Sequence, residues 1–336
     1  MSIRIVTAVV VTLSTVMVGE AADSFRELEV ESTVTTHVIA WGRYSRFRCD
    51  SGGNIYLRIW NEDLKSPVTR VSGDGEKVTQ FVIPADEDLA GIQDFWVADD
   101  GHLYILADKP PDKAYVLSFD ADGKHKSSTQ LDVPLRANQI AVFDSGDFLI
   151  AGRQSVPPEP GAALANGAPF VGIFNDRGQL LKKVEFGKDI KPDPKQPLLR
   201  ADLHYAEAIV GSATAAGDDG TVYFMRRGID GPIYAVSAAG LITKTIRLKP
   251  PEDAHLATVK IAKGTLAAEF LRKTGDDSRI ESILTQLIDI RTGRKITEFK
   301  SVPPLGPDFA CYSPDEFTFL SNDEKGYLTI LRAKGR

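Results

Sequence analysis

The feature that most constrains this chain is a stretch that predicts two consecutive β-hairpins, Gly91–Lys124. Its apolar residues alternate, and a turn at Asp99-Asp100-Gly101 separates the first two predicted strands. A second turn, at Asp120–Gly123, separates the next two. Gly adopts positive φ without steric cost and Asp tolerates it, so both turns are typical of hairpins. The stretch therefore predicts one four-stranded antiparallel sheet.

The same pattern recurs along the chain. Related turns are Cys49–Asn54, Asp144–Asp147, Gly217–Gly220, Ala262–Gly264 and Ser313–Glu316. Every copy except the last is followed by a second hairpin. The spacing is mostly about 45–50 residues, the size of one four-stranded propeller blade. We therefore predict an all-β, six-bladed β-propeller.

The last copy is one strand short, because the chain ends soon after Gly326–Arg332. A strand-like run near the N-terminus, Phe25–Val30, belongs to no other copy. We expect this run to complete the last blade, so that pairing of the two ends closes the ring. Closure of this kind also covers an otherwise exposed sheet edge.

The motif in Gly91–Lys124 resembles an NHL-type repeat, in which Asp-x-x-Gly turns separate short strands. The whole chain from residue 23 to residue 336 is similar to six-bladed propellers of the NHL or TolB-like class. The resemblance implies one propeller domain over residues 23–336. It implies blade geometry and no particular chemistry.

The first 22 residues are typical of a signal peptide. Arg4 precedes an apolar run over Ile5–Val18, and Gly19–Ala22 offers small residues for cleavage. We therefore expect a secreted or periplasmic protein without a transmembrane span in the mature chain. The net charge of −6 argues against a nucleic-acid partner.

The resemblance also predicts which face carries the long loops. In such propellers, loops that lead into the innermost strands share one face with loops that join the second and third strands. Two long Pro-rich insertions, Arg153–Pro169 and Gly187–Asp202, fall on this long-loop face. Loops held by a rigid scaffold often bind ligands. An insertion without a role is the alternative.

Basic side chains and two histidines are predicted on the same face. They are Arg58, Lys109, Arg153, Arg226, Arg227, Arg272, His204 and His255. Guanidinium groups bind carboxylates and phosphates, so this rim suits an acidic partner. Acidic residues in the same loops, such as Asp108 and Asp112, favour the alternative of a solvated surface of mixed charge.

Aligning the copies on their turns places four polar residues at the channel mouth: Arg46, Asp94, Gln139 and Asp308. Lactonase-like six-bladed propellers hold Ca²⁺ at this place. Calcium takes six to eight oxygen ligands, and two carboxylates and one amide beside an Arg supply too few. We therefore predict no metal, no other cofactor and no catalytic residue.

The two cysteines, Cys49 and Cys311, occupy equivalent positions in the first and last predicted blades. In an exported protein they would form a disulfide across the closure, if their strands approach closely enough. Two buried free thiols are the alternative.

The predicted function is an exported binding or scaffold propeller that recognises a peptide, carbohydrate or acidic partner through the long-loop face. The alternative is a metal-dependent hydrolase or lyase of the lactonase-like kind, acting at the channel mouth.

Overall fold

The structure is a computed structural model that describes residues 26–42, 44–59, 63–154, 168–186, 214–217, 220–225, 232–252, 254–274, 279–314 and 316–336. The regular elements of these residues are all β-strands. No helix in this part of the chain is long and apolar enough to cross a membrane.

Four antiparallel sheets contain four strands each, in chain order. The first sheet holds β2 (Tyr44–Cys49), β3 (Ile55–Ile59), β4 (Val68–Val71) and β5 (Val78–Phe81). The second holds β6 (Gly91–Val97), β7 (Leu103–Lys109), β8 (Lys113–Phe119) and β9 (His125–Gln130). The third holds β10 (Leu135–Val142), β11 (Phe148–Gln154), β12 (Ala168–Phe174) and β13 (Leu180–Lys183). The fourth holds β14 (Thr214–Ala216), β15 (Val222–Met225), β16 (Ile233–Val236) and β17 (Ile242–Ile246).

The remaining eight strands form one sheet in the order β18-β19-β20-β21-β1-β24-β23-β22. Its C-terminal strands are β18 (Ala254–Ala262), β19 (Thr265–Thr274), β20 (Arg279–Asp289), β21 (Lys295–Ser301), β22 (Phe309–Ser313), β23 (Glu316–Asn322) and β24 (Tyr327–Gly335). The N-terminal strand, β1 (Arg26–Ile39), lies in the middle. The pairing of β1 with β21 is parallel and short, whereas all other pairings in this sheet are antiparallel.

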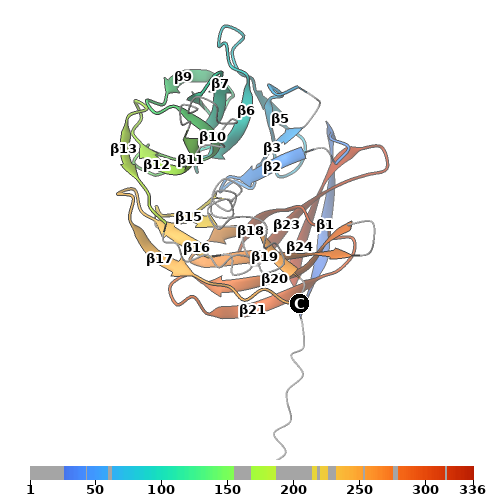
Figure 1. Cartoon of the computed structure of the whole chain (residues 1–336). Helices are drawn as coiled ribbons and strands as arrows, with labels where there is room; N and C mark the ends of the chain where they lie inside the picture. The colour runs from blue at the N-terminus through green and yellow to red at the C-terminus, as the bar shows by residue number, and fades with distance from the viewer. Residues whose placement is uncertain are drawn as a thin grey trace, which may run out of the picture.

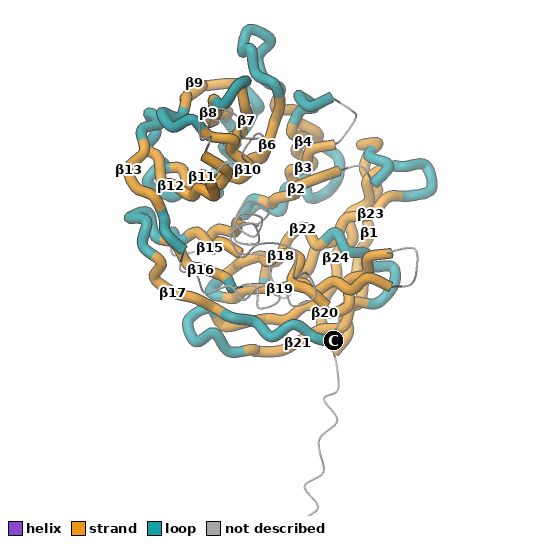
Figure 2. Tube along the Cα trace, in the orientation of Figure 1, coloured by secondary structure: helices purple, strands orange, loops and turns teal. Residues whose placement is uncertain are grey.

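The sheets follow one another around a common centre (Figures 1 and 2). Their first strands form a closed cycle, in which β2 contacts β6, β6 contacts β10, and so on through β14, β18 and β22 back to β2. Sheets arranged radially around a ring of first strands make a β-propeller. The prediction of an all-β propeller is confirmed.

The N-terminal strand pairs with the last strand of the chain, as the sequence predicts. The register runs from Leu28 opposite Gly335 to Ile39 opposite Tyr327. The strand is longer than the predicted Phe25–Val30, because it continues along nearly the whole of β24. The backbone groups of β24 therefore have a partner strand on both sides.

The turns of the repeat have the backbone conformation that their composition predicts. Gly101 and Gly123 have φ values of 81° and 87°. Each closes a turn by donating its N–H to a backbone carbonyl, that of Ala98 at 2.9 Å and that of Asp120 at 3.0 Å. The Asp120 carboxylate also accepts the N–H of Lys124 at 2.9 Å. Asp residues in these turns therefore satisfy the backbone rather than bind a ligand.

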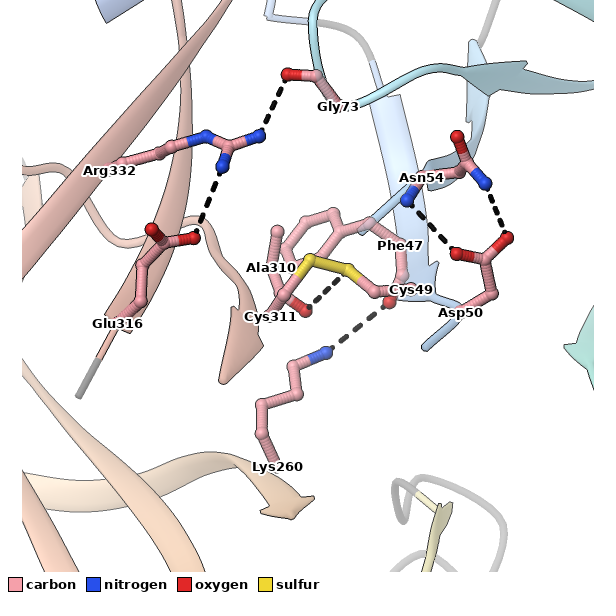
Figure 3. Close-up of a disulfide and its surroundings, with 10 residues drawn as sticks. All are labelled: Phe47, Cys49, Asp50, Asn54, Gly73, Lys260, Ala310, Cys311, Glu316 and Arg332. Carbon is pink, nitrogen blue, oxygen red and sulfur yellow. Dashed lines mark hydrogen bonds and ion pairs between the residues drawn. A yellow bond between two sulfur atoms is a disulfide. The ribbon is translucent and has the colours of Figure 1, made fainter. Parts of the chain in front are cut away.

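Cys49 on β2 and Cys311 on β22 form a disulfide across the point where the ring closes (Figure 3). Their Cα atoms lie 5.9 Å apart, within the range that a bridge prefers. The separation is short because β2 and β22 are neighbouring first strands in the closed cycle. The ends of the chain are thus joined twice, by β1–β24 pairing and by this covalent bond.

We predict that the double substitution Cys49→Ala/Cys311→Ala lowers the free energy of unfolding by about 2–4 kcal/mol. The cysteines are 262 residues apart, so the chain-entropy effect of the bond is near its upper limit of about 5 kcal/mol. Pairing of β1 with β24 already restricts the ends, which reduces the loss. Denaturant titration with and without a reductant measures the effect. The double variant should not respond to reductant, and two titratable thiols in the unreduced parent protein would contradict the prediction.

Candidate functional site

A β-bulge recurs in five of the six first strands of the described chain. The ladder skips Arg46 in β2, Gln93 in β6, Asn138 in β10, Ala257 in β18 and Ala310 in β22. A bulge bends a strand and redirects the neighbouring side chains. Each bulge therefore changes which side chains of its strand face the centre of the ring.

These bulges correct the predicted alignment at the channel mouth. Arg46 lies on a bulge, but Asp94 and Gln139 each follow one, and Asp308 precedes β22. Asp94 and Gln139 are therefore at equivalent positions, as predicted, whereas Arg46 and Asp308 are not. The prediction counted residues from the turns, and the stretch between bulge and turn differs in length from strand to strand. The aligned Ala213 lies outside the described residues.

Asp94 lies at the centre of a buried ion network. Its carboxylate is paired with Arg46 at 3.2 Å and with Arg48 at 3.3 Å. One of its oxygens also accepts the backbone N–H of Ile140 on the next sheet at 3.0 Å. Arg48 donates its Nε–H to the carbonyl of Phe95 at 2.6 Å and stacks over the Trp96 ring at 4.6 Å.

This network joins three sheets and already neutralises Asp94. Arg46 reaches the carboxylate from a bulge with a φ of 50°, a conformation that residues other than glycine rarely adopt. Burial lowers the pKa of Arg48, and the Asp94 charge opposes that effect. With two cations and a backbone donor around it, Asp94 fits a structural ion pair better than a metal ligand.

A second group of buried charges lies on β18 and β19, and no sequence motif predicts it. Glu269 is 1% exposed, and burial raises its pKa well above the usual value. The nearby Asp308 charge raises this pKa further, whereas hydrogen bonding to Ser282 and the charge of Lys260 lower it. Gln139 on β10 is also buried. Among the described residues, no group of three His, Cys, Asp or Glu side chains could hold a metal ion.

Most described residues of the predicted basic rim already have hydrogen-bond or ion-pair partners within the protein. Arg58 is buried and donates to the carbonyls of Ile92 at 2.7 Å and Leu64 at 2.8 Å, so it holds a loop rather than facing a ligand. Lys109 pairs with Asp88 at 3.1 Å. Arg272 donates to the carbonyl of Glu252 at 3.0 Å.

Of the other predicted rim residues, Arg153 is partly buried at the end of β11, and His255 is exposed near the start of β18. Arg226, Arg227, His204 and nearly all of both insertions lie outside the described residues. Asp112, which the sequence analysis proposed as a neutralising group, pairs with Arg136 at 3.2 Å. Three of the described rim residues, Arg58, Lys109 and Arg272, therefore already have partners within the protein.

Trp41 is an exposed aromatic residue on the long-loop face. It follows β1 in the loop to β2, and its side chain is 64% exposed. Its backbone N–H donates to the carbonyl of Gly326 at 3.1 Å, and its φ is 49°. The indole packs directly on Gly326, where an added Cβ would lie 2.4 Å from the ring. Leu64 in the β3–β4 loop and Val82 after β5 are more than half exposed on the same face.

Comparison with known proteins gives no family. No family model and no curated protein matches the chain. Among similar solved structures is a protein of unknown function from Bacteroides caccae, with 14% identity over 76% of this chain and 81% of that chain, at a TM-score of 0.48. Another is the PQQ-bound aldose sugar dehydrogenase of Streptomyces coelicolor, with 13% identity over 93% and 98% and a TM-score of 0.44. The Pan2 WD40 domain of Neurospora crassa has 10% identity over 92% and 95% and a TM-score of 0.47. At these values the similarities carry no information about ligand or activity.

We predict that Asp94→Asn lowers the free energy of unfolding by about 3 kcal/mol, because it leaves two arginines without their buried counter-charge. The matched control is Asp112→Asn, which removes an ion pair whose arginine side chain is 73% exposed. That control should lose less than about 1 kcal/mol. Equal losses in denaturant titrations of the two variants would contradict the structural role of Asp94.

We also predict that Glu269→Gln makes stability less dependent on pH. The folded pKa of Glu269 exceeds the unfolded value of 4.5, so the folded state binds more protons between these two values. Stability contributed by this group is therefore complete below pH 4.5 and is lost as the pH rises through the folded pKa.

A glutamine mimics the neutral acid at every pH. The variant should match the parent Tm near pH 4 and exceed it by at least about 2 °C at pH 8. Glu281→Gln, at an exposed position on β20, is the control and should leave the pH profile unchanged. A Tm difference at position 269 that does not grow with pH would contradict the assignment.

Proposed function

We propose that this protein is an exported binding or scaffold propeller that recognises a peptide or carbohydrate through its long-loop face. The observation that carries this proposal is Trp41, an exposed indole whose backbone conformation is strained. Strain of this kind persists where the surroundings fix it, and it is frequent at binding sites. The turn at Gly326 supports one part of the indole, and the remainder is available to a partner.

Rigid exposed aromatic groups are well suited to recognition, because they bring a large contact area and lose little conformational freedom on binding. The exposed side chains of Leu64 and Val82 add apolar surface on the same face. An acidic partner is supported less well, since Lys109 is paired with Asp88 and Arg272 donates to the carbonyl of Glu252.

Within this proposal the propeller has six blades and belongs to the NHL or TolB-like class. The closed cycle of six first strands supports this count. The eight-stranded sheet then consists of two blades, β18–β21 and β22–β24 with β1. Their outer strands, β1 and β21, pair over only three residues, beginning with Arg26 opposite Phe299.

Export through the signal peptide over residues 1–22 is part of the proposal, and these residues lie outside the described chain. The disulfide between Cys49 and Cys311 supports a secreted or periplasmic location, because such bonds persist in oxidising compartments.

The metal-dependent hydrolase or lyase is the less well supported alternative. It requires Asp94 and Asp308 to share an ion at the channel mouth, but the Asp94 carboxylate already has Arg46 and Arg48 as partners. EDTA treatment decides between the two functions. We expect it to leave the Tm unchanged, and a fall in Tm that Ca²⁺ restores would favour the alternative.

To test the binding function, glycan and peptide arrays are probed with labelled parent protein and with Trp41→Ala. Removal of a central aromatic contact typically costs 1–2 kcal/mol, so we expect about a tenfold loss of affinity. Leu181→Ala is the control, because Leu181 is also more than half exposed but lies on β13, an outer strand away from this face. Equal binding by the parent and Trp41→Ala, or no binding to either array, would overturn the proposal.

A further inference from the structure

A cavity of about 880 Å³ opens at the end of the ring opposite the long-loop face. The turns that follow the first strands converge there, and the Cys49–Cys311 disulfide forms part of the wall. Its volume lies within the range of sites that bind small molecules. Four buried or half-buried aromatic side chains, Trp96, Tyr104, Phe143 and Tyr312, give it apolar wall area.

Lys260 reaches this cavity from β18. Its Nζ donates to the carbonyl of Phe47 at 3.3 Å and lies 5.2 Å from the centre of the Phe47 ring (Figure 3). Among the described residues, no carboxylate is within ion-pair distance of this Nζ. An ammonium group has three donors to satisfy, so a half-buried position with one acceptor favours the neutral amine.

The charged groups around Lys260 reinforce this preference. Arg48 faces it from β2 and repels the ammonium form. Glu269 is opposite Thr258 in the pairing of β18 with β19. Thr258 and Lys260 are two residues apart on β18, so their side chains share one face of the sheet. Glu269 therefore lies on the same face as Lys260. The high pKa of Glu269 reduces the counter-charge that it offers.

The remaining charges of the cavity wall have both signs. The acidic groups are Asp50, Asp99, Asp100, Asp144 and Glu316, and the other cations are Lys263 and Arg332. Arg332 is already engaged, since it donates to the carbonyl of Gly73 at 2.8 Å and pairs with Glu316. Burial, followed by the Arg48 charge, lowers the pKa of Lys260 to about 7, and Glu269 opposes this shift.

We propose that Lys260 is a nucleophilic amine that binds small aldehydes or ketones covalently in this cavity. The Nζ lone pair attacks the carbonyl carbon to form a C–N bond, and the carbonyl oxygen takes up a proton. The resulting carbinolamine loses that oxygen as water, which leaves a C=N bond to Nζ. One amine and one carbonyl compound thus give one imine and one water, without an oxidant or reductant.

The geometry of the cavity suits such a ligand. Lys260 is partly exposed to the cavity, so the amine is accessible to a small carbonyl compound. The indole of Trp96, which Arg48 covers on one face, lines the same cavity and provides apolar contact there. This site is independent of the long-loop face and does not rest on the binding function proposed above.

The test labels the mature protein with limiting glycolaldehyde and cyanoborohydride at pH 7, so that any imine is reduced to a stable secondary amine. Peptide mass mapping then compares Lys260 with Lys263, an exposed lysine that lines the same cavity. We expect Lys260 to be labelled at least about tenfold faster, because half of an amine with a pKa near 7 is neutral at that pH. Its labelling rate should level off by about pH 8, whereas an ordinary lysine continues to gain reactivity up to about pH 10.

The second measurement uses glycolaldehyde without a reductant. Reversible imine formation should raise the Tm of the parent protein and leave that of Lys260→Arg unchanged. Circular dichroism checks that the Lys260→Arg variant is folded. If the variant does not fold, the labelling of Lys260 relative to Lys263 in the parent protein still decides the test. Labelling of Lys260 no faster than that of Lys263, or the same pH profile at both, would overturn the proposal.

Discussion

The antiparallel pairing of β1 with β24 is the interaction on which the rest of the ring depends. A propeller is stable only if its last sheet meets its first, and here the final sheet lacks one strand until the N-terminal segment supplies it. The pairing extends from Leu28 to Ile39, so many backbone hydrogen bonds hold the ring closed. The disulfide between Cys49 and Cys311 fixes the inner strands at the same place. Closure at both the inner and outer ends of the seam keeps the first strands in their cycle.

That closed cycle explains why charges are buried in the middle of the molecule. The first strands surround the centre of the ring, and in the described part of the chain charged side chains from neighbouring sheets meet there. Asp94 balances Arg46 and Arg48 there, and the pKa of Glu269 rises because burial disfavours its charge. Buried ion pairs often contribute little net stability, since desolvation offsets their attraction. Their evident effect is to link neighbouring sheets, as Asp94 does between β2, β6 and β10.

The sequence predicts the hairpins and the closure because both rest on local chemistry. Asp-Gly turns, alternating strands and an unassigned run near the N-terminus are visible in the chain itself. The burial of the central charges cannot be seen in the sequence. Lys260 and Glu269 lie within strands in which charged residues usually face solvent, and only the assembled ring shows that they face inward. Arg58 was wrongly expected on the rim, because its long side chain turns back to backbone carbonyls. Asp94 and Gln139 keep the register that counting from the turns predicts, whereas Arg46 lies on a bulge and Asp308 lies before β22.

The closure and the environment of Lys260 are physically connected. The carbonyl that accepts its Nζ–H belongs to Phe47, two residues before Cys49 on β2. The Cys49 sulfur in turn lies 3.6 Å from the carbonyl of Ala310 on the neighbouring β22 segment. If β2 and β22 separated, water would reach the amine from the seam, and the burial that lowers its pKa would be lost. The seam that holds the ring together therefore also maintains the neutral amine, so the reactivity of Lys260 depends on a correctly closed propeller.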